Sequence, residues 1–82
     1  MKDNEITGII IDTGLMIHKA LGPGLLESVY EAILSYELVR RGLSVERQVP
    51  IPVVWDDLLL NEGFRADLIV EKRVIVELKS IE

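Results

Sequence analysis

Residues 64–80, FRADLIVEKRVIVELKS, constrain the fold of this chain more than any other stretch. Apolar residues alternate with other residues on both sides of Glu71-Lys72-Arg73, and this period of two is typical of strands that bury one side. The apolar positions are Ala66, Leu68 and Val70 before the loop and Val74, Val76 and Leu78 after it. The stretch therefore predicts an antiparallel hairpin.

The register of this hairpin follows from its apolar sides. Directly opposed residues of an antiparallel pair lie on the same side of the sheet, and a slip of one residue would separate the two apolar sets. The simplest solution is a three-residue loop at 71–73, with Val70 opposite Val74. We expect the last strand to continue from Val74 to Ser80.

Charged residues gather on the second side of the hairpin. The same register places Asp67 opposite Glu77 and Arg65 opposite Lys79. Two carboxylates about 5 Å apart repel each other by roughly 3 kcal/mol at an effective dielectric constant near 20. That repulsion is large for a small domain, so the acids require an explanation.

Two interpretations of this acidic pair are open. On a solvated side of the sheet, the acids would pair with Arg65 and Lys79. Alternatively, a divalent cation lies between the carboxylates, because Mg²⁺ prefers oxygen ligands. Ile69 and Ile75 share this side, so we expect a helix to cover it in part, which favours the second interpretation.

Two helices are predicted before the sheet. The first runs from Asn4 to about Leu21, with Asp3 or Asn4 as its N-cap. The second runs from about Leu26 to Arg41, and Gly42 ends it. Its expected apolar face comprises Leu26, Val29, Ala32, Ile33, Tyr36 and Leu38.

A strand is predicted from Leu43 to Trp55. Its core-facing residues are Val45, Val49, Ile51, Val53 and Trp55, which share one parity. Pro50 and Pro52 share the other parity, and their missing N–H groups are tolerated only at a sheet edge. Asp56-Asp57 then turns the chain into a strand from Leu58 to Val70. The predicted fold class is α+β, with two N-terminal helices packed on a three-stranded antiparallel sheet.

Composition sets limits on function and location. The 82 residues are 49% hydrophobic, which predicts one globular domain over residues 1–82 with a thin aliphatic core. The chain has no cysteine, and its net charge of −5 argues against holding nucleic acid by bulk charge. No stretch resembles a signal peptide or a membrane span, so we expect a cytoplasmic protein without a membrane partner. Candidates for local phosphate contacts are Arg40, Arg41, Arg47, Lys72 and Arg73.

Several stretches together resemble one known family. Asp67 followed by Glu77-Leu78-Lys79 is similar to the D…(D/E)-x-K signature of the PD-(D/E)XK nuclease superfamily. The stretch 24–30, GLLESVY, resembles the motif that names the GxxExxY proteins, a branch of that superfamily. HKALGP at 18–23 and FRADLIV at 64–70 also fit. The resemblance covers nearly the whole chain and implies a restriction-endonuclease-like core.

The resemblance also implies a site and a reaction. Asp67 and Glu77 would be metal ligands, with the backbone carbonyl of Leu78 as a third, and Glu27 would add an acid from a helix. Lys79 resembles the catalytic lysine, which orients or helps deprotonate the attacking water and offsets charge on the phosphate. The implied cofactor is Mg²⁺ or Mn²⁺. The implied reaction is metal-assisted hydrolysis of phosphodiester bonds in nucleic acid, with DNA favoured over RNA.

The chain departs from the family pattern in one respect. The superfamily core is α-β-β-β-α-β, whereas this sequence ends three residues after Lys79. The C-terminal helix and strand are therefore expected to be absent and the domain incomplete. An unpaired edge on the last strand predicts a homo-oligomer through an exposed sheet edge or face. The alternative function is a catalytically inactive nuclease-fold module for interaction or oligomerisation.

Accessory roles at this site are predicted for Tyr30, His18 and Arg65. Tyr30 lies three residues after Glu27, so its hydroxyl can reach the same site, although a packed ring with a hydrogen-bonded hydroxyl is the other interpretation. His18 is either a ligand or acid–base group, or it caps the negative end of the first helix or packs near Gly22-Pro23-Gly24. We interpret Gly22-Pro23-Gly24 as a turn rather than a phosphate loop. Trp55 is expected in the core or at an interface.

Overall fold

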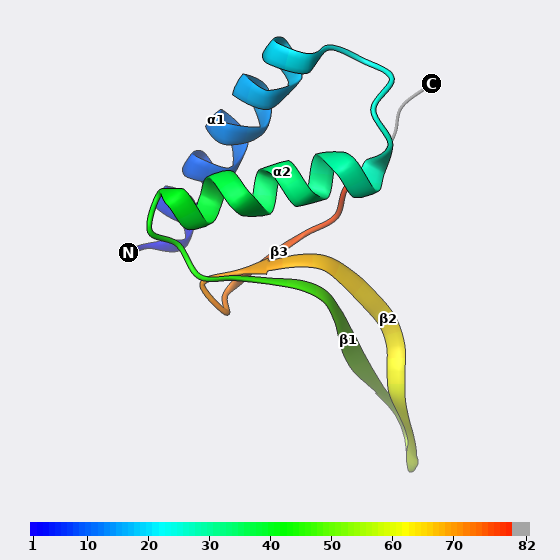
Figure 1. Ribbon diagram of the computed structural model, residues 1–82. Helices are drawn as coiled ribbons and strands as arrows, with labels where there is room; N and C mark the ends of the chain where they lie inside the picture. Colours follow the sequence, from blue (N-terminus) through cyan, green and yellow to red (C-terminus); the bar gives the residue numbers. More distant parts are fainter. Residues whose placement is uncertain (80–82) are drawn as a thin grey trace.

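The computed structural model describes residues 1–79. The elements are helices α1 (Asp3–Leu21) and α2 (Glu27–Arg40) and strands β1 (Val45–Trp55), β2 (Leu58–Val70) and β3 (Val74–Val76). The sheet is antiparallel in the order β1-β2-β3, so β1 is an edge strand, as its prolines predict. Both helices lie on one side of the sheet, and the far part of the β1–β2 hairpin projects away from them (Figure 1). The predicted α+β architecture is confirmed.

The core lies between the two helices and the near half of the sheet. Its buried residues are Ile6, Ile10, Ile17, Leu34, Leu38, Leu43, Leu68 and Val70. The buried Thr13 hydroxyl donates a hydrogen bond to the Ile9 carbonyl oxygen at 2.6 Å, so it is not left unpaired. The core is thus aliphatic, as the composition predicts. In the described part of the chain, no helix is long and apolar enough to cross a membrane.

The predicted helix boundaries are correct to within one residue, but the predicted N-cap of α1 is wrong. The cap is Lys2, whose backbone N–H donates to the Glu5 carboxylate at 3.2 Å. Asp3 and Glu5 therefore lie in the first turn, where the helix dipole favours acidic side chains. Arg73 reaches the same end of α1 and forms an ion pair with Asp3 at 2.7 Å.

The predicted apolar face of α2 is also wrong in part. The helix buries Glu31, Leu34 and Leu38, whereas Leu26 and Tyr36 are mostly exposed. Leu34 and Leu38 are four residues apart and so lie on one helical face. A count of apolar residues misses this face, because one of its members is a charged residue with a partner on the sheet.

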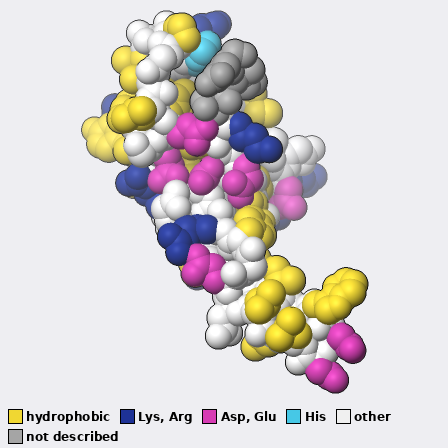
Figure 2. Space-filling view, turned by 90° about the vertical axis from the view of Figure 1, so that its right-hand side faces the viewer, with side chains coloured by type: hydrophobic (Ala, Val, Ile, Leu, Met, Phe, Trp, Pro, Cys, Tyr) yellow, Lys and Arg dark blue, Asp and Glu magenta, His cyan; other side chains and the backbone are white. Residues whose placement is uncertain are grey.

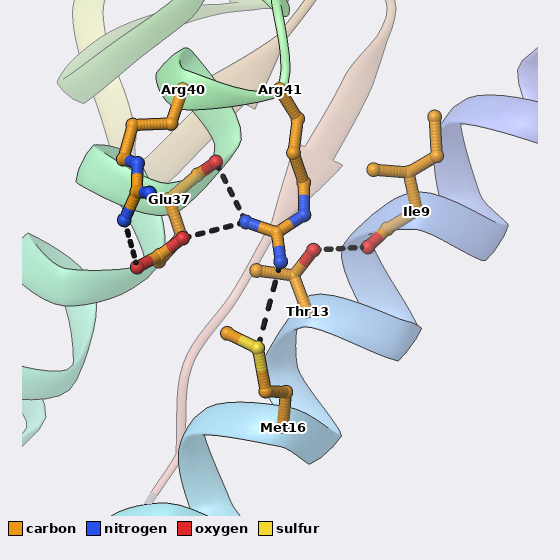
Figure 3. A network of polar contacts seen from close by, with 6 residues as sticks. All are labelled: Ile9, Thr13, Met16, Glu37, Arg40 and Arg41. Carbon is orange, nitrogen blue, oxygen red and sulfur yellow. Dashed lines mark hydrogen bonds and ion pairs between the residues drawn. The ribbon is translucent and has the colours of Figure 1, made fainter.

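A polar network ties the end of α2 to α1 (Figure 3). Arg41 donates to the Glu37 carbonyl oxygen at 3.0 Å and to the Glu37 carboxylate at 2.7 Å, and it approaches Met16 Sδ at 3.5 Å. Arg40 forms a second ion pair with Glu37 at 3.2 Å. Both arginines are candidates for phosphate contacts by sequence, but here Arg41 joins the two helices and Arg40 pairs within α2.

The β2–β3 hairpin has the predicted register. Its pairs are Leu68 with Val76, Ile69 with Ile75 and Val70 with Val74. The loop is fixed from outside, because the Glu71 carboxylate accepts hydrogen bonds from the Ser44 backbone N–H and hydroxyl, both at 2.8 Å. These two bonds, the backbone one first, hold the pKa of Glu71 below its ordinary value.

Two expectations about this hairpin are wrong. Strand β3 ends at Val76 rather than continuing to Ser80, and Ser80 itself lies outside the described residues. The helices cover the side that carries the fully buried Leu68 and Val70, whereas Ile75 on the other side is 50% exposed. The helices thus pack on the side with the larger apolar set, and Ile75 lies on the side that they leave exposed.

The β1–β2 hairpin turns at Asp56-Asp57, as predicted, and its register shifts between Ile51 and Val53. Val53 and Trp55, which the sequence predicts to face a core, are 40% and 77% exposed. Their parity is the one predicted, but the helices do not extend over this part of the hairpin (Figure 1).

Gly63 is required where the register shifts. A Cβ built on Gly63 would lie 2.6 Å from the Cβ of Val53 and closer still to its Cγ2. We expect Gly63→Ala to lower the free energy of unfolding by about 1–3 kcal/mol, because a β-branched neighbour on a paired strand cannot easily move away. The measurement is urea denaturation followed by circular dichroism.

The matched control for this prediction is Gly8→Ala in α1, where an added Cβ meets nothing within 4 Å. That change should instead stabilise the protein by about 0.5–1 kcal/mol, because glycine is unfavourable inside a helix. Equal stabilities of the two variants would contradict the close contact between Gly63 and Val53.

Candidate functional site

The predicted acids lie where β3 separates from β2. The backbone N–H of Leu78 donates to Oδ2 of Asp67 at 2.7 Å. The Asp67 carboxylate thus takes a backbone N–H of the segment that would otherwise extend β3. The pairing of β2 with β3 ends at Leu68 and Val76. The expected pairing of Asp67 with Glu77 is therefore wrong, although Asp67 remains bonded to the residue that follows Glu77.

Arg65 does not lie opposite Lys79 either. It is paired across the sheet with Pro50 of β1 and forms an ion pair with Glu62 of its own strand, with Nε 2.9 Å from Oε1. Because β3 has already ended, this part of β2 has no paired neighbour on that side among residues 1–79. The accessory role predicted for Arg65 therefore has no contact to support it.

Two open clefts of similar size flank the separation of the strands. The turn cleft has a volume of about 420 Å³ and is lined by the 22–25 turn together with His18, Glu27, Tyr30, Glu77, Leu78 and Lys79. The sheet cleft has a volume of about 410 Å³ and is lined by Glu27, Ser28, Glu31, Arg47, Gln48, Asp67 and Leu78. Glu27 and Leu78 line both clefts. Figure 2 shows acidic side chains gathered on this face of the molecule, with basic side chains beside them.

The turn cleft contains the predicted lysine and two of the predicted acids. Glu77 and Lys79 are exposed and follow the end of β3, whereas Glu27 is the first residue of α2. The positive end of the helix dipole favours an acid at that position. The turn cleft thus combines an ammonium group with carboxylates on two different elements.

Tyr30 and His18 line the same cleft, but their surroundings differ. The Tyr30 hydroxyl donates to the Gly14 carbonyl oxygen at 2.6 Å, which agrees with the interpretation of a packed ring with a bonded hydroxyl. His18 is exposed in the last turn of α1, and its carbonyl oxygen accepts the Gly22 N–H at 2.8 Å. Gly22 and Gly24 have φ values of 71° and 96°, so their segment is a turn that requires glycine.

A charged network that the sequence analysis missed supports the sheet cleft. Glu31 of α2 is only 5% exposed; its Oε2 accepts a hydrogen bond from Arg47 Nε at 3.0 Å and forms an ion pair with Nη2 at 3.0 Å. Gln48 Nε2 donates to Oε1 of Glu31 at 2.7 Å and lies 3.5 Å from Oδ1 of Asp67. Gln48 has a φ of 52°, which is uncommon for a residue other than glycine. The network connects the buried Glu31 to the candidate metal ligand Asp67.

One signal for this network was available in the sequence. Arg47 has the same parity as Val45 and Val49, which are predicted to face the core. A charge at a core-facing position requires a buried partner. Glu31, four residues after Glu27 on the same helix, is a suitable candidate because residues four apart are neighbours on a helical face.

The residues present fit a divalent cation by donor type. Asp67 and Glu77 supply carboxylate oxygens and Leu78 a carbonyl oxygen, which are the ligands that Mg²⁺ prefers. Within residues 1–79, no group of three His, Asp or Glu side chains is arranged to hold a metal ion. Mg²⁺ usually keeps several waters and needs only one or two carboxylates. The donors therefore suit a weak, water-rich site rather than a closed cage.

Comparison with known proteins gives one positive finding. Residues 4–82 match a family model described as the PD-(D/E)XK nuclease superfamily. The match covers almost all of the chain and extends over Asp67, Glu77 and Lys79. It does not resolve the narrower GxxExxY branch. No curated protein and no solved structure matched the chain.

Proposed function

Because this chain belongs to the PD-(D/E)XK nuclease superfamily, we propose that it is a metal-dependent nuclease of the GxxExxY branch that hydrolyses phosphodiester bonds. Membership supports a nuclease-like function in general. The single observation that supports the proposal most is the hydrogen bond from the Leu78 backbone to Asp67. It fixes one predicted ligand to the segment that carries Glu77 and Lys79, the other acid and the lysine of the signature.

Each residue of the site has a role in the proposed reaction. Asp67 and Glu77, with the carbonyl of Leu78, would hold Mg²⁺ or Mn²⁺, and Glu27 would add a carboxylate from the start of α2. When bound, the ion would activate water and stabilise developing negative charge. The ammonium group of Lys79 would orient the attacking water and offset charge on a phosphate oxygen.

The overall charge is consistent with such a mechanism. With a net charge of −5, the chain repels a phosphodiester unless local cations neutralise the contact. We therefore propose that the bound ion and Lys79 supply most of the attraction to the substrate. The proposed substrate is nucleic acid, DNA rather than RNA, and the proposed location is the cytoplasm.

Asp67→Asn tests this function without removing the acceptor for the Leu78 N–H, because the amide keeps one oxygen. In the wild type, Mg²⁺ or Mn²⁺ should raise the melting temperature, since a ligand at 100 times its Kd stabilises by about 2.7 kcal/mol. Asp67→Asn should lose both this rise and the cleavage of single- and double-stranded DNA and RNA. Asp12→Asn changes an exposed acid of α1 in the same way and should behave as the wild type.

Two results would contradict the proposal. If the wild type cleaves none of these substrates although the metal raises its melting temperature, the enzyme proposal is wrong and the inactive binding module replaces it. If the metal stabilises Asp67→Asn as much as the wild type, Asp67 is not a ligand.

A further inference from the structure

The outer part of the β1–β2 hairpin carries an exposed apolar surface, which we call the arm surface. It consists of three directly opposed pairs, Ile51 with Phe64, Val53 with Leu60 and Trp55 with Leu58. Exposed fractions are 77% for Trp55, 55% for Leu58, 47% for Leu60, 45% for Phe64 and 40% for Val53. Figure 2 shows hydrophobic side chains gathered along this projecting part of the molecule.

The arm surface is the outward continuation of the core side of the sheet. Opposed residues lie on the same side of the sheet. The next pair inward is Val49 with Ala66, and Ala66 is fully buried. The same alternation thus passes from a part that the helices cover to a part that they do not (Figure 1). A strand with one apolar side is stable in water when that side is covered. Contiguous exposed apolar surface of this kind marks an interaction site.

The size of the arm surface fits a stable protein interface. From their exposed fractions, its side chains present roughly 500–600 Å² of apolar area, since a fully exposed aromatic side chain offers about 150–250 Å². A standard interface covers about 800 Å² per partner, of which the apolar share is about 56–65%. The apolar area needed is thus about 450–520 Å², and one arm surface supplies it.

The charges near the arm surface indicate which kind of partner covers it. The turn at the tip carries two acids, Asp56 and Asp57. These acids disfavour an anionic lipid surface and a phosphate backbone. A second copy of the chain is compatible with them. If a twofold axis relates two arms that point in opposite directions, the acidic turns lie at opposite ends of the dimer. The same patch is then used twice, as in most homodimers.

We propose that the chain forms a homodimer in which two arm surfaces pack face to face as two sheets. Aligned sheets pack about 10 Å apart with strand directions within about 30°. Trp55 and Leu58, the most exposed pair, lie near the tip, so each copy inserts them against the inner part of the other arm. This dimer is independent of the proposed nuclease reaction, because none of the candidate site residues lies on the arm surface.

Trp55 provides the measurement, since it is the only tryptophan of the chain. Sedimentation velocity over a range of concentrations should show a monomer–dimer equilibrium. The Trp55 emission should shift to shorter wavelength in parallel, as the ring leaves water. A monomer with water-exposed Trp55 emission at every concentration would overturn the proposal.

Two adjacent leucines give a matched pair of variants. Leu60 lies on the arm surface, whereas Leu59 is paired with Val54 on the opposite side and is 58% exposed. Leu60→Lys should raise the dimer dissociation constant at least about tenfold, because each dimer buries the new charge twice. Leu59→Lys makes the same chemical change and should leave that constant close to the wild-type value. Circular dichroism verifies that both variants fold.

Three other results would contradict a dimer formed through the arm surface. Equal weakening by the two variants would indicate that loss of leucine from the hairpin, not the arm surface, controls association. No weakening by Leu60→Lys would place the contact elsewhere, for example at the edge of β3, which pairs with no other strand within residues 1–79. A shift of Trp55 emission on vesicles of anionic lipid, with the protein monomeric in solution, would identify a membrane surface as the occupant and overturn the dimer.

Discussion

Lys79→Ala is expected to reduce phosphodiester cleavage at least about 100-fold while leaving the stabilisation by Mg²⁺ intact. Removing one group that stabilises transition-state charge typically lowers kcat by about 10²–10³. Lys79 is exposed and follows the end of β3, so its truncation should change the free energy of unfolding little. The measurement is the initial rate of cleavage at saturating Mg²⁺, with the melting temperature recorded with and without the ion.

The matched control for Lys79→Ala is Lys72→Ala. Lys72 is an exposed lysine in the β2–β3 loop, and its removal changes the net charge by the same amount. The sequence makes it a candidate for a phosphate contact, but it lines neither the turn cleft nor the sheet cleft. If cleavage depends on the position of one ammonium group, Lys72→Ala keeps a rate close to that of the wild type. Equal losses in the two variants would show that bulk charge, not a lysine in the turn cleft, limits the reaction. A wild-type rate in Lys79→Ala would remove that residue from the mechanism.

The sheet was the most predictable part of this fold. Two apolar sets of period two, separated by three residues, leave one simple register, and Val70 is paired with Val74 as that register requires. The prolines of β1 fix the edge for a similar reason, because Pro50 and Pro52 offer no N–H to a second neighbour. Both features follow from local properties of the sequence: the alternation of apolar residues sets the register, and the missing proline N–H groups set the edge.

The end of β3 was not predictable in this way. Periodicity assigns Leu78 to the same apolar side as Val74 and Val76, so the strand is expected to continue. The backbone N–H of Leu78 instead bonds to the Asp67 carboxylate. Competition between a side-chain acceptor and a strand carbonyl depends on three-dimensional geometry that a pattern of apolar residues does not contain.

The covered side of the sheet shows a second limit of the pattern. The sequence identifies which residues of the β2–β3 hairpin share a side, and the observed pairing agrees with this assignment. It does not give the length over which a helix covers that side. The same parity is therefore buried at Leu68 and exposed at Leu60. The candidate site residues come from the resemblance and stay a prediction, whereas the network of Glu31, Arg47 and Gln48 beside them was found only in the structure.

Arg47→Ala is expected to lower the free energy of unfolding by about 3 kcal/mol, which is a large share of the stability of a small domain. Glu31, which is 5% exposed in the wild type, would lose the guanidinium group, and among residues 1–79 the Gln48 amide would be its remaining side-chain donor. A buried charge without its partner is among the most destabilising single changes. Glu31→Ala should be milder, at about 1–2 kcal/mol, because the side chain of Arg47 is 46% exposed and can turn to water. Urea denaturation measures both values.

The double variant Glu31→Leu, Arg47→Met separates burial of charge from loss of packing. It removes both charges and replaces them with apolar groups of similar volume, a change that is often neutral or stabilising for a buried ion pair. Its free energy of unfolding should therefore lie above that of Arg47→Ala. If Arg47→Ala is the mildest of these variants, the pair behaves as a surface ion pair, which contributes only about 0–1 kcal/mol. Gln48 alone would then satisfy Glu31, and the connection from Glu31 to Asp67 would not depend on the arginine.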